Sequence, residues 1–187
     1  MCDIELEMAD FIANEESPEV ETTMVETEPW PIYVDGSFRE TDGKSYCGYG
    51  VFYGAGDARN KSVVVEDEQA NNQRAELLAI IHALRDIKEN QTDQAFCIRT
   101  DSNSSIQSIT VLLVKWEKFG WRTKKKTFVK NKDLIQNASL LYREILLMYR
   151  KRGWKFRIEH IKGHSGEIGN EGADRLAVEA AGYLENI

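Results

Sequence analysis

The order of hydrophobic and polar residues predicts three strands in succession after residue 30. Ile32, Tyr33 and Val34 form a first apolar run, and segments 46–53 and 62–66 are rich in β-branched and aromatic residues. Gly36 and Gly43 are expected to bracket the turn after the first strand. Strands that follow one another through short turns predict an antiparallel meander.

After residue 70 the pattern changes to strands that alternate with helices. Apolar residues recur at helical spacing and predict a helix over 70–89 with one face packed on the sheet. Further along, short apolar runs predict strands at 96–100 and 156–161. Helical spacing predicts a helix that begins after Asp101-Ser102 and carries Ile106, Ile109, Leu112 and Leu113, and further helices at 132–151 and 170–181. A meander joined to parallel strands with helices packed on them predicts an α/β fold with a mixed five-stranded sheet.

The first 29 residues lack this periodicity. They are rich in Glu and Thr, which predicts a disordered acidic N-terminal tail followed by one folded domain over 30–187. The remaining length is sufficient for one domain with its own core.

Charge is distributed very unevenly along the chain, whose formal net charge is −7. Residues 1–30 contain ten acidic and no basic residues, whereas residues 115–162 contain fifteen Lys or Arg against four acidic residues. Such a contrast matters more than the total charge, because a strongly basic segment is typical of contact with nucleic acid.

Other features of the sequence bear on where the protein acts. We find no apolar stretch that approaches the roughly 18 residues of a membrane span and no basic, apolar leader, which favours a cytoplasmic or nuclear location and argues against membrane partners. The three cysteines, Cys2, Cys47 and Cys97, lie far apart and are expected to be reduced, the last two within strands.

Four carboxylates occupy special positions in the predicted elements. Asp35 and Asp101 are expected to end the first and fourth strands, and Glu76 and Asp174 lie in the first turns of helices. Strand ends of open α/β sheets are the usual ligand sites, and clustered carboxylates need a cation, for which Mg²⁺ is the natural candidate. Each acid also has a purely structural explanation as a helix cap, a favourable first-turn charge or a turn residue, and spacing alone leaves both open.

Four stretches of sequence together resemble the type 1 ribonuclease H family. They are Tyr33-Val34-Asp35-Gly36-Ser37, Asn72-Gln73-Arg74-Ala75-Glu76-Leu77, Thr100-Asp101-Ser102 and the segment from Gly163-His164-Ser165-Gly166 to Ala173-Asp174-Arg175. The resemblance spans about residues 31–182. It implies a ribonuclease H-like fold and an enzyme that cleaves the RNA strand of RNA–DNA hybrids to 5′-phosphate and 3′-hydroxyl products. It implies no N-terminal hybrid-binding module.

The resemblance also implies a set of site residues. Asp35, Glu76, Asp101 and Asp174 correspond to the metal ligands of a two-ion magnesium site, in which Mn²⁺ is a possible substitute. His164 corresponds to a mobile histidine assigned to proton transfer or product release. The partner would be a hybrid duplex, and we expect the protein to be a monomer.

Further residues resemble substrate contacts of the family. Asn72 and Gln73 match residues that reach base edges and 2′-hydroxyls across the minor groove, although a helix cap is the structural alternative. Asn131 matches a residue of a DNA phosphate pocket. The basic segment 116–126 resembles the protrusion that grips the DNA strand, and its candidate contacts are Trp116, Trp121, Lys124, Lys125 and Lys126. Its structural alternative is an ordinary solvated charged face.

Some positions depart from the family pattern. Gln69 and Asn71 stand where many eukaryotic members have an arginine and a threonine, and Ser104 and Leu112 stand where aromatic residues often line the DNA channel. These departures affect the expected DNA-strand affinity rather than catalysis. The rival interpretations are a non-catalytic hybrid-binding module, another nuclease or recombinase of the same superfold, and a structural domain.

Overall fold

The computed structural model of the chain describes residues 28–90 and 92–182, so the predicted acidic tail lies almost wholly outside the described residues. Five strands form one mixed sheet in the order β3-β2-β1-β4-β5. β1 pairs antiparallel with β2 and β2 with β3, whereas β1–β4 and β4–β5 are parallel. The predicted fold class is therefore confirmed.

The elements follow one another as the sequence pattern indicates. The strands are β1 (Trp30–Thr41), β2 (Lys44–Phe52), β3 (Lys61–Val64), β4 (Phe96–Thr100) and β5 (Ile158–His160). The helices are α2 (Asn72–Glu89), α3 (Asn103–Gln107), the π-helical turn η1 (Ser108–Leu112), α4 (Leu113–Lys118), α5 (Lys132–Lys151) and α6 (Ile168–Ala180). The fifth strand is shorter than expected, and Phe156 lies in the buried core instead.

The first strand differs most from the prediction. β1 does not end near Asp35: it runs through Asp35 and Gly36 to Thr41, because β2 supplies hydrogen-bonding partners along this length. The turn lies at Asp42-Gly43, where both residues have positive φ (53° and 70°), as a two-residue hairpin of this type requires. What does end near Asp35 is the parallel pairing with β4, whose last pair is Tyr33 with Arg99.

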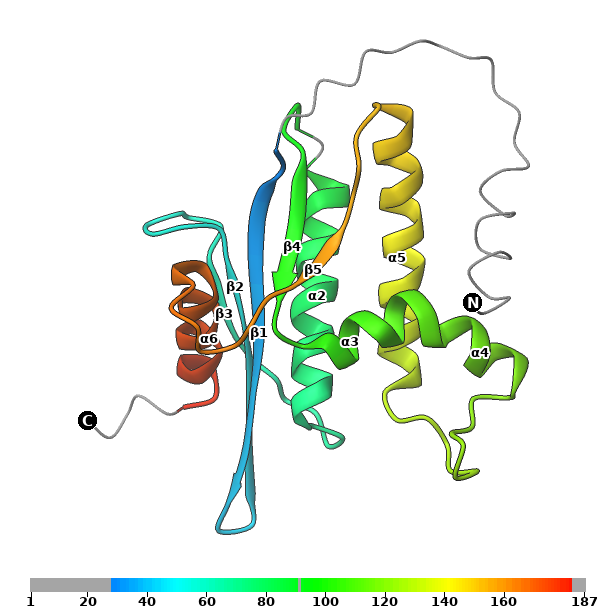
Figure 1. The fold of residues 1–187 in the computed structure, drawn as a ribbon. Helices are drawn as coiled ribbons and strands as arrows, with labels where there is room; N and C mark the ends of the chain where they lie inside the picture. Colours follow the sequence, from blue (N-terminus) through cyan, green and yellow to red (C-terminus); the bar gives the residue numbers. More distant parts are fainter. Residues whose placement is uncertain (1–27, 91, 183–187) are drawn as a thin grey trace.

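Helices cover both faces of the sheet. α6 packs on β1 and β2 from one side, and α2 packs on them from the other, with α5 against α2 (Figure 1). The main core lies on the α2 side and includes Val34, Ile98, Leu77 and Ile145, while Tyr33, Phe52 and Ala173 form a smaller core on the α6 side. No helix formed by residues 28–90 and 92–182 is long and apolar enough to span a bilayer.

Gly36 allows α2 to lie unusually close to β1. A Cβ atom at Gly36 would come within 2.8 Å of both the carbonyl carbon and the Cβ of Ala75 and would also contact the backbone nitrogen of Glu76. Any side chain here would therefore push the first turns of α2 away from the strand. The contact places Glu76 beside the residue that precedes Gly36, which is Asp35.

The second predicted helix is interrupted by the π-helical turn η1. Ile109 and Leu113 are buried, as their spacing predicts, but Leu112 is partly exposed and does not belong to the main core. A π-helical turn adds a residue to the helical repeat and so changes which side chains share a face. Leu112 can therefore line the surface groove described below.

We predict that Gly36→Ala destabilises the fold by about 1–3 kcal/mol, the usual cost of overpacking, because the new methyl group meets backbone atoms of α2. Chemical unfolding measures this change. The matched control is Gly56→Ala, where a Cβ meets no atom within 4 Å and the cost comes from a positive φ of 72°. Equal, small effects of both changes would contradict the importance of the close approach.

Candidate active site

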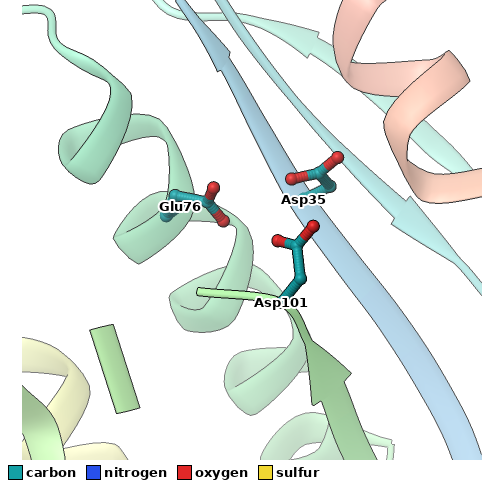
Figure 2. A group of neighbouring side chains, drawn as sticks. All are labelled: Asp35, Glu76 and Asp101. Atoms are coloured by element: carbon teal, nitrogen blue, oxygen red, sulfur yellow. The ribbon is translucent and has the colours of Figure 1, made fainter. Parts of the chain in front are cut away.

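Three carboxylates meet where the parallel pairing of β1 and β4 ends. Asp35 comes from β1, Glu76 from α2 and Asp101 from the residue after β4, and one oxygen of each lies within 4.8 Å of the others (Figure 2). Their side chains point toward a common centre. Three of the four acids expected from the sequence are thus brought together by elements that are distant in the chain.

Burial makes this group electrostatically unusual. Asp35 is 7% exposed and Glu76 is 4% exposed. Burial, with the charge of Asp101 next, raises the pKa of Asp35 to about 7 although the Gly36 amide donates a 2.8 Å hydrogen bond to it. Burial, followed by the charges of Asp35 and Asp101, raises the pKa of Glu76 to about 9. The group therefore favours protons or another positive charge at its centre.

Asp174 approaches the same group from α6. It lies outside the three carboxylates that share the 4.8 Å centre, yet it interacts with Asp35 by charge and by a side-chain hydrogen bond, and both effects raise the pKa of Asp35. Asp174 is half-buried, so its carboxylate can adjust to a ligand. The structure thus places all four predicted acids in one region, three at its centre and one beside it.

The two oxygens of the Glu76 carboxylate have different surroundings. Glu76 Oε1 is 3.5 Å from Asn72 Nδ2, but Oε2 is among the few buried polar side-chain atoms in the described residues with no hydrogen-bond partner. A buried carboxylate oxygen without a partner is costly. A hard cation bound by oxygen ligands would satisfy it, so this donor set fits Mg²⁺ or Mn²⁺.

His164 lies in the loop between β5 and α6. It is exposed and has a positive φ of 50°, and Gly166 in the same loop has a φ of 83°. The loop contacts the carboxylates through Gly163, where a Cβ atom would lie 2.5 Å from Asp101 Oδ2. The candidate histidine is therefore held next to the acidic group without being buried in it.

The amide side chains expected to contact substrate gather at the N-termini of α2 and α5. Asn131 is 7% exposed and donates to Asn71 Oδ1 at 3.2 Å and to Gln73 Oε1 at 3.4 Å. Asn71 also caps α2 by accepting a 3.0 Å bond from the Arg74 amide, so the capping role considered for Asn72 belongs to its neighbour. Asn72 is exposed and Gln73 is half-buried. Two helix N-termini with amide donors between them suit an anion such as phosphate.

Sequence reasoning missed the residue that joins these two helices. Arg74 is buried, pairs with Asp67 at 2.5 Å and donates two hydrogen bonds, of 3.1 and 2.9 Å, to Asp133 at the start of α5. Pairing with Arg74 contributes to a lowered pKa of both Asp133 and Asp67. Its partner on α5 is 59 residues away, so no local signal in the sequence identifies this pair.

The basic segment surrounds a groove next to α4. This basic groove has a volume of about 490 Å³ and is lined by Leu112, Lys115, Trp116, Phe119, Arg122, Thr123 and Lys124. Lys125 and Lys126 are exposed beside it. Trp116 is one of the residues that line this groove.

The expectation that Trp121 contacts substrate together with Trp116 does not fit its position in the structure. It is only 8% exposed, packs 6.1 Å from the ring of Trp116 and belongs to the main core. Its amide donates a 2.7 Å bond to the Trp116 carbonyl, and its φ is 58°. Trp121 therefore anchors the basic segment to the domain, because a large apolar ring at a chain reversal is more stable buried than exposed.

Comparisons with known proteins agree with this geometry. A family model described as RNase H matches residues 27–182. The chain is 41% identical over 151 residues to a ribonuclease H of Schizosaccharomyces pombe, covering 80% of this chain and 52% of that protein. It is 38% identical over 146 residues to a ribonuclease H of Ruthia magnifica, covering 78% and 90%. The chain spans about half the length of the fungal and mammalian relatives that it matches.

Solved structures share the same fold. A foamy viral protease–reverse transcriptase in complex with an RNA/DNA hybrid superposes with a TM-score of 0.63 at 22% identity, covering 91% of this chain and 23% of that one. LC9-RNase H1, a type 1 enzyme with the type 2 active-site motif, has a TM-score of 0.57 at 27% identity and covers 84% and 75%. Because the family model matches all of the described residues, the chain belongs to the ribonuclease H family.

Proposed function

We propose that this protein is an endonuclease that hydrolyses the RNA strand of RNA–DNA hybrids in a metal-dependent reaction. The observation that carries the proposal is the convergence of three carboxylates from three elements, two of them buried with pKa values raised to about 7 and 9. Several relatives carry the names Ribonuclease H or H1, which supports the same reaction.

Asp35, Glu76, Asp101 and Asp174 would hold the metal ions. When bound, two Mg²⁺ ions would polarise the scissile phosphate and stabilise the attacking and leaving oxygens of an in-line displacement, which leaves a 5′-phosphate and a 3′-hydroxyl. The chain's own contribution is to fix the four acids before substrate arrives. Burial of Asp35 and Glu76 keeps bulk water from competing for their oxygens.

The surrounding residues would position the duplex. His164 is exposed in the loop whose Gly163 lies against Asp101, and it would accept or donate a proton near the leaving group or assist product release. Asn72 and Gln73 carry amides that both donate and accept, which suits base edges and 2′-hydroxyls of a minor groove. Asn131 and the basic groove would bind phosphates of the DNA strand, with exposed Lys124, Lys125 and Lys126 adding non-specific affinity.

The rival interpretations explain less of this arrangement. A non-catalytic hybrid-binding module has no need for buried carboxylates that repel one another and leave Glu76 Oε2 unpartnered. A nuclease specific for duplex DNA would gain nothing from amides suited to a 2′-hydroxyl. Substrate selectivity therefore separates the candidates.

We predict that the protein with Mg²⁺ cleaves a labelled RNA–DNA hybrid but neither duplex RNA nor duplex DNA. Asp35→Asn and Asp101→Asn should each lower kcat by about a hundredfold or more, since several kcal/mol of transition-state stabilisation is lost. The control is Asp42→Asn at the exposed hairpin turn, where Asn-Gly is equally favourable. Near-normal turnover in both acidic-site variants would exclude the metal-ligand assignment.

We also predict that stability of the metal-free protein falls as the pH rises. Ordinary pKa values of 3.8 and 4.5 rise to about 7 for Asp35 and about 9 for Glu76 on folding. Above pH 4 the unfolded chain therefore holds fewer protons than the folded one, and stability is lost progressively up to about pH 9. Thermal unfolding from pH 5 to 9 with a chelator measures this loss.

Saturating Mg²⁺ should restore the stability, by about 2.7 kcal/mol at a hundredfold excess over Kd. Glu76→Gln should flatten the pH dependence above pH 7 and weaken the effect of Mg²⁺. A Tm that is independent of both pH and Mg²⁺ would contradict a cation site formed by these acids.

The basic groove yields a prediction at Leu112. Because Leu112 is half-buried and lines the groove, Leu112→Trp should add an aromatic face for nucleic acid and lower the Kd for hybrid several-fold, with kcat nearly unchanged. The matched control is Leu113→Trp, whose residue is 3% exposed, and which should lower stability by about 1–3 kcal/mol without tighter binding. Equal behaviour of the two variants would show that Leu112 does not face the duplex.

A further inference from the structure

A row of polar side chains crosses the sheet on the face that α6 covers. Tyr33 of β1 is in register with Arg99 of β4, and Arg99 is in register with Glu159 of β5. Arg99 Nε donates to Glu159 Oε2 at 2.8 Å, and Arg99 Nη1 donates to the Tyr33 hydroxyl at 3.1 Å. Arg157 also donates to Glu159. The row is thus a continuous hydrogen-bonded network across three parallel strands.

The network extends to the residue that precedes the last helix. The Tyr33 hydroxyl donates a 2.6 Å hydrogen bond to Glu167 Oε1, and Arg99 Nη1 lies 3.9 Å from the same oxygen. The direction of these bonds follows from chemistry: a guanidinium only donates, so the Tyr33 oxygen accepts from Arg99 and its single proton goes to Glu167. Burial and the bond to Glu167 raise the pKa of Tyr33, which keeps that proton in place.

Glu167 is the N-cap residue of α6 but makes no side-chain capping bond, because its carboxylate is engaged by Tyr33. It also ends the loop that carries His164. The loop begins at Ile161, whose amide donates to the Thr100 carbonyl at 3.0 Å. Both ends of the loop are therefore tied to the sheet, one by backbone and the other by the Tyr33–Glu167 bond.

Between these two ties, the loop has few constraints of its own. Ser165 Oγ donates to the Lys162 carbonyl at 2.7 Å, and Gly163 lies against Asp101. His164 and Gly166 both have positive φ, a backbone conformation that is costly for His164 unless the surrounding structure holds it. The position of His164 relative to Asp101 thus depends on where Glu167 is held.

We propose that Tyr33, Arg99 and Glu167 are positioning residues for the cleavage reaction, which fix the His164 loop beside the carboxylates. The inference rests on the proposed hybrid cleavage. Tyr33 does not need to touch the substrate: it is 9% exposed, and its ring packs against Gly169 of α6. The effect of the three positioning residues is on turnover rather than on binding of the duplex.

The test is a double-mutant cycle between Tyr33 and His164. Tyr33→Phe keeps the ring that packs on Gly169 and removes the hydroxyl alone, so kcat on the hybrid should fall by roughly three- to tenfold, as for one lost hydrogen bond, with KM unchanged. In a His164→Ala background, the same change should alter kcat by less than about twofold, because both substitutions act through one element.

Conservative and matched variants complete the design. Glu167→Ala should reproduce the loss seen in Tyr33→Phe, whereas Glu167→Gln should retain most activity, since its amide oxygen still accepts from Tyr33. Tyr53→Phe is the control: its hydroxyl donates a 2.8 Å bond to Asp86, remote in the fold from the carboxylates, and kcat should not change. Melting temperatures of Tyr33→Phe and Tyr53→Phe should be similar.

The results distinguish failure of the positioning role from failure of the proposed function. Turnover of Tyr33→Phe equal to that of the unaltered protein, multiplicative losses in the double variant, or a raised KM would each overturn the positioning role while leaving the proposed function intact. Absence of hybrid cleavage by the unaltered protein with Mg²⁺ would overturn the proposed function, and the positioning role with it.

Discussion

The close contact between α2 and β1 at Gly36 is the constraint on which the site depends. Because Gly36 lacks a side chain, the backbone of Ala75 and Glu76 lies directly on the strand, and Glu76 reaches the carboxylate of Asp35. Apolar packing of Leu77 and Ile80 on the same face supplies the driving force for this approach. Hydrophobic burial therefore places two acids together that would otherwise repel each other.

The repulsion between these acids lowers the stability of the folded protein, and no basic side chain is seen to pair with them in the described residues. The buried guanidinium of Arg74, two residues before Glu76, does not neutralise the acids: it pairs with Asp67 and Asp133 instead, at the junction of α2 and α5. The carboxylate group thus keeps the raised pKa values of Asp35 and Glu76 and a buried oxygen without a partner. A site of this kind gains stability from a bound cation and is prepared for it before binding.

The two faces of the sheet contribute differently to the site. The α2 face supplies Glu76 and the amide cluster of Asn71, Gln73 and Asn131, held by the Arg74 pairs. The α6 face supplies Asp174 and, through the Tyr33–Glu167 bond, the position of the His164 loop. The basic groove is a third part, connected to the core by the buried ring of Trp121. The acidic group and the basic groove therefore lie in separate parts of one domain.

The periodicity of apolar residues alone predicted most of the secondary structure. The spacing of apolar residues fixed α2 and α5 to within two residues, as well as β4 and the mixed sheet, because each element must bury one side. The short motifs around Asp35, Glu76, Asp101 and Asp174 identified the four acids. Such motifs can be recognised from the order of their residues alone, before any contact between them is known. The resemblance to type 1 ribonucleases H followed from those residues.

Contacts between distant residues decided the rest. The length of β1 depended on β2 as a partner, the burial of Trp121 on its packing with Trp116, and the exposure of Leu112 on a π-helical turn that spacing does not reveal. The Arg74–Asp133 pair joins residues 59 apart in the chain, and the Tyr33–Glu167 bond joins residues 134 apart. A sequence pattern reports which face of an element is apolar, but only the packed structure decides which polar groups meet, because that depends on how the elements lie against one another.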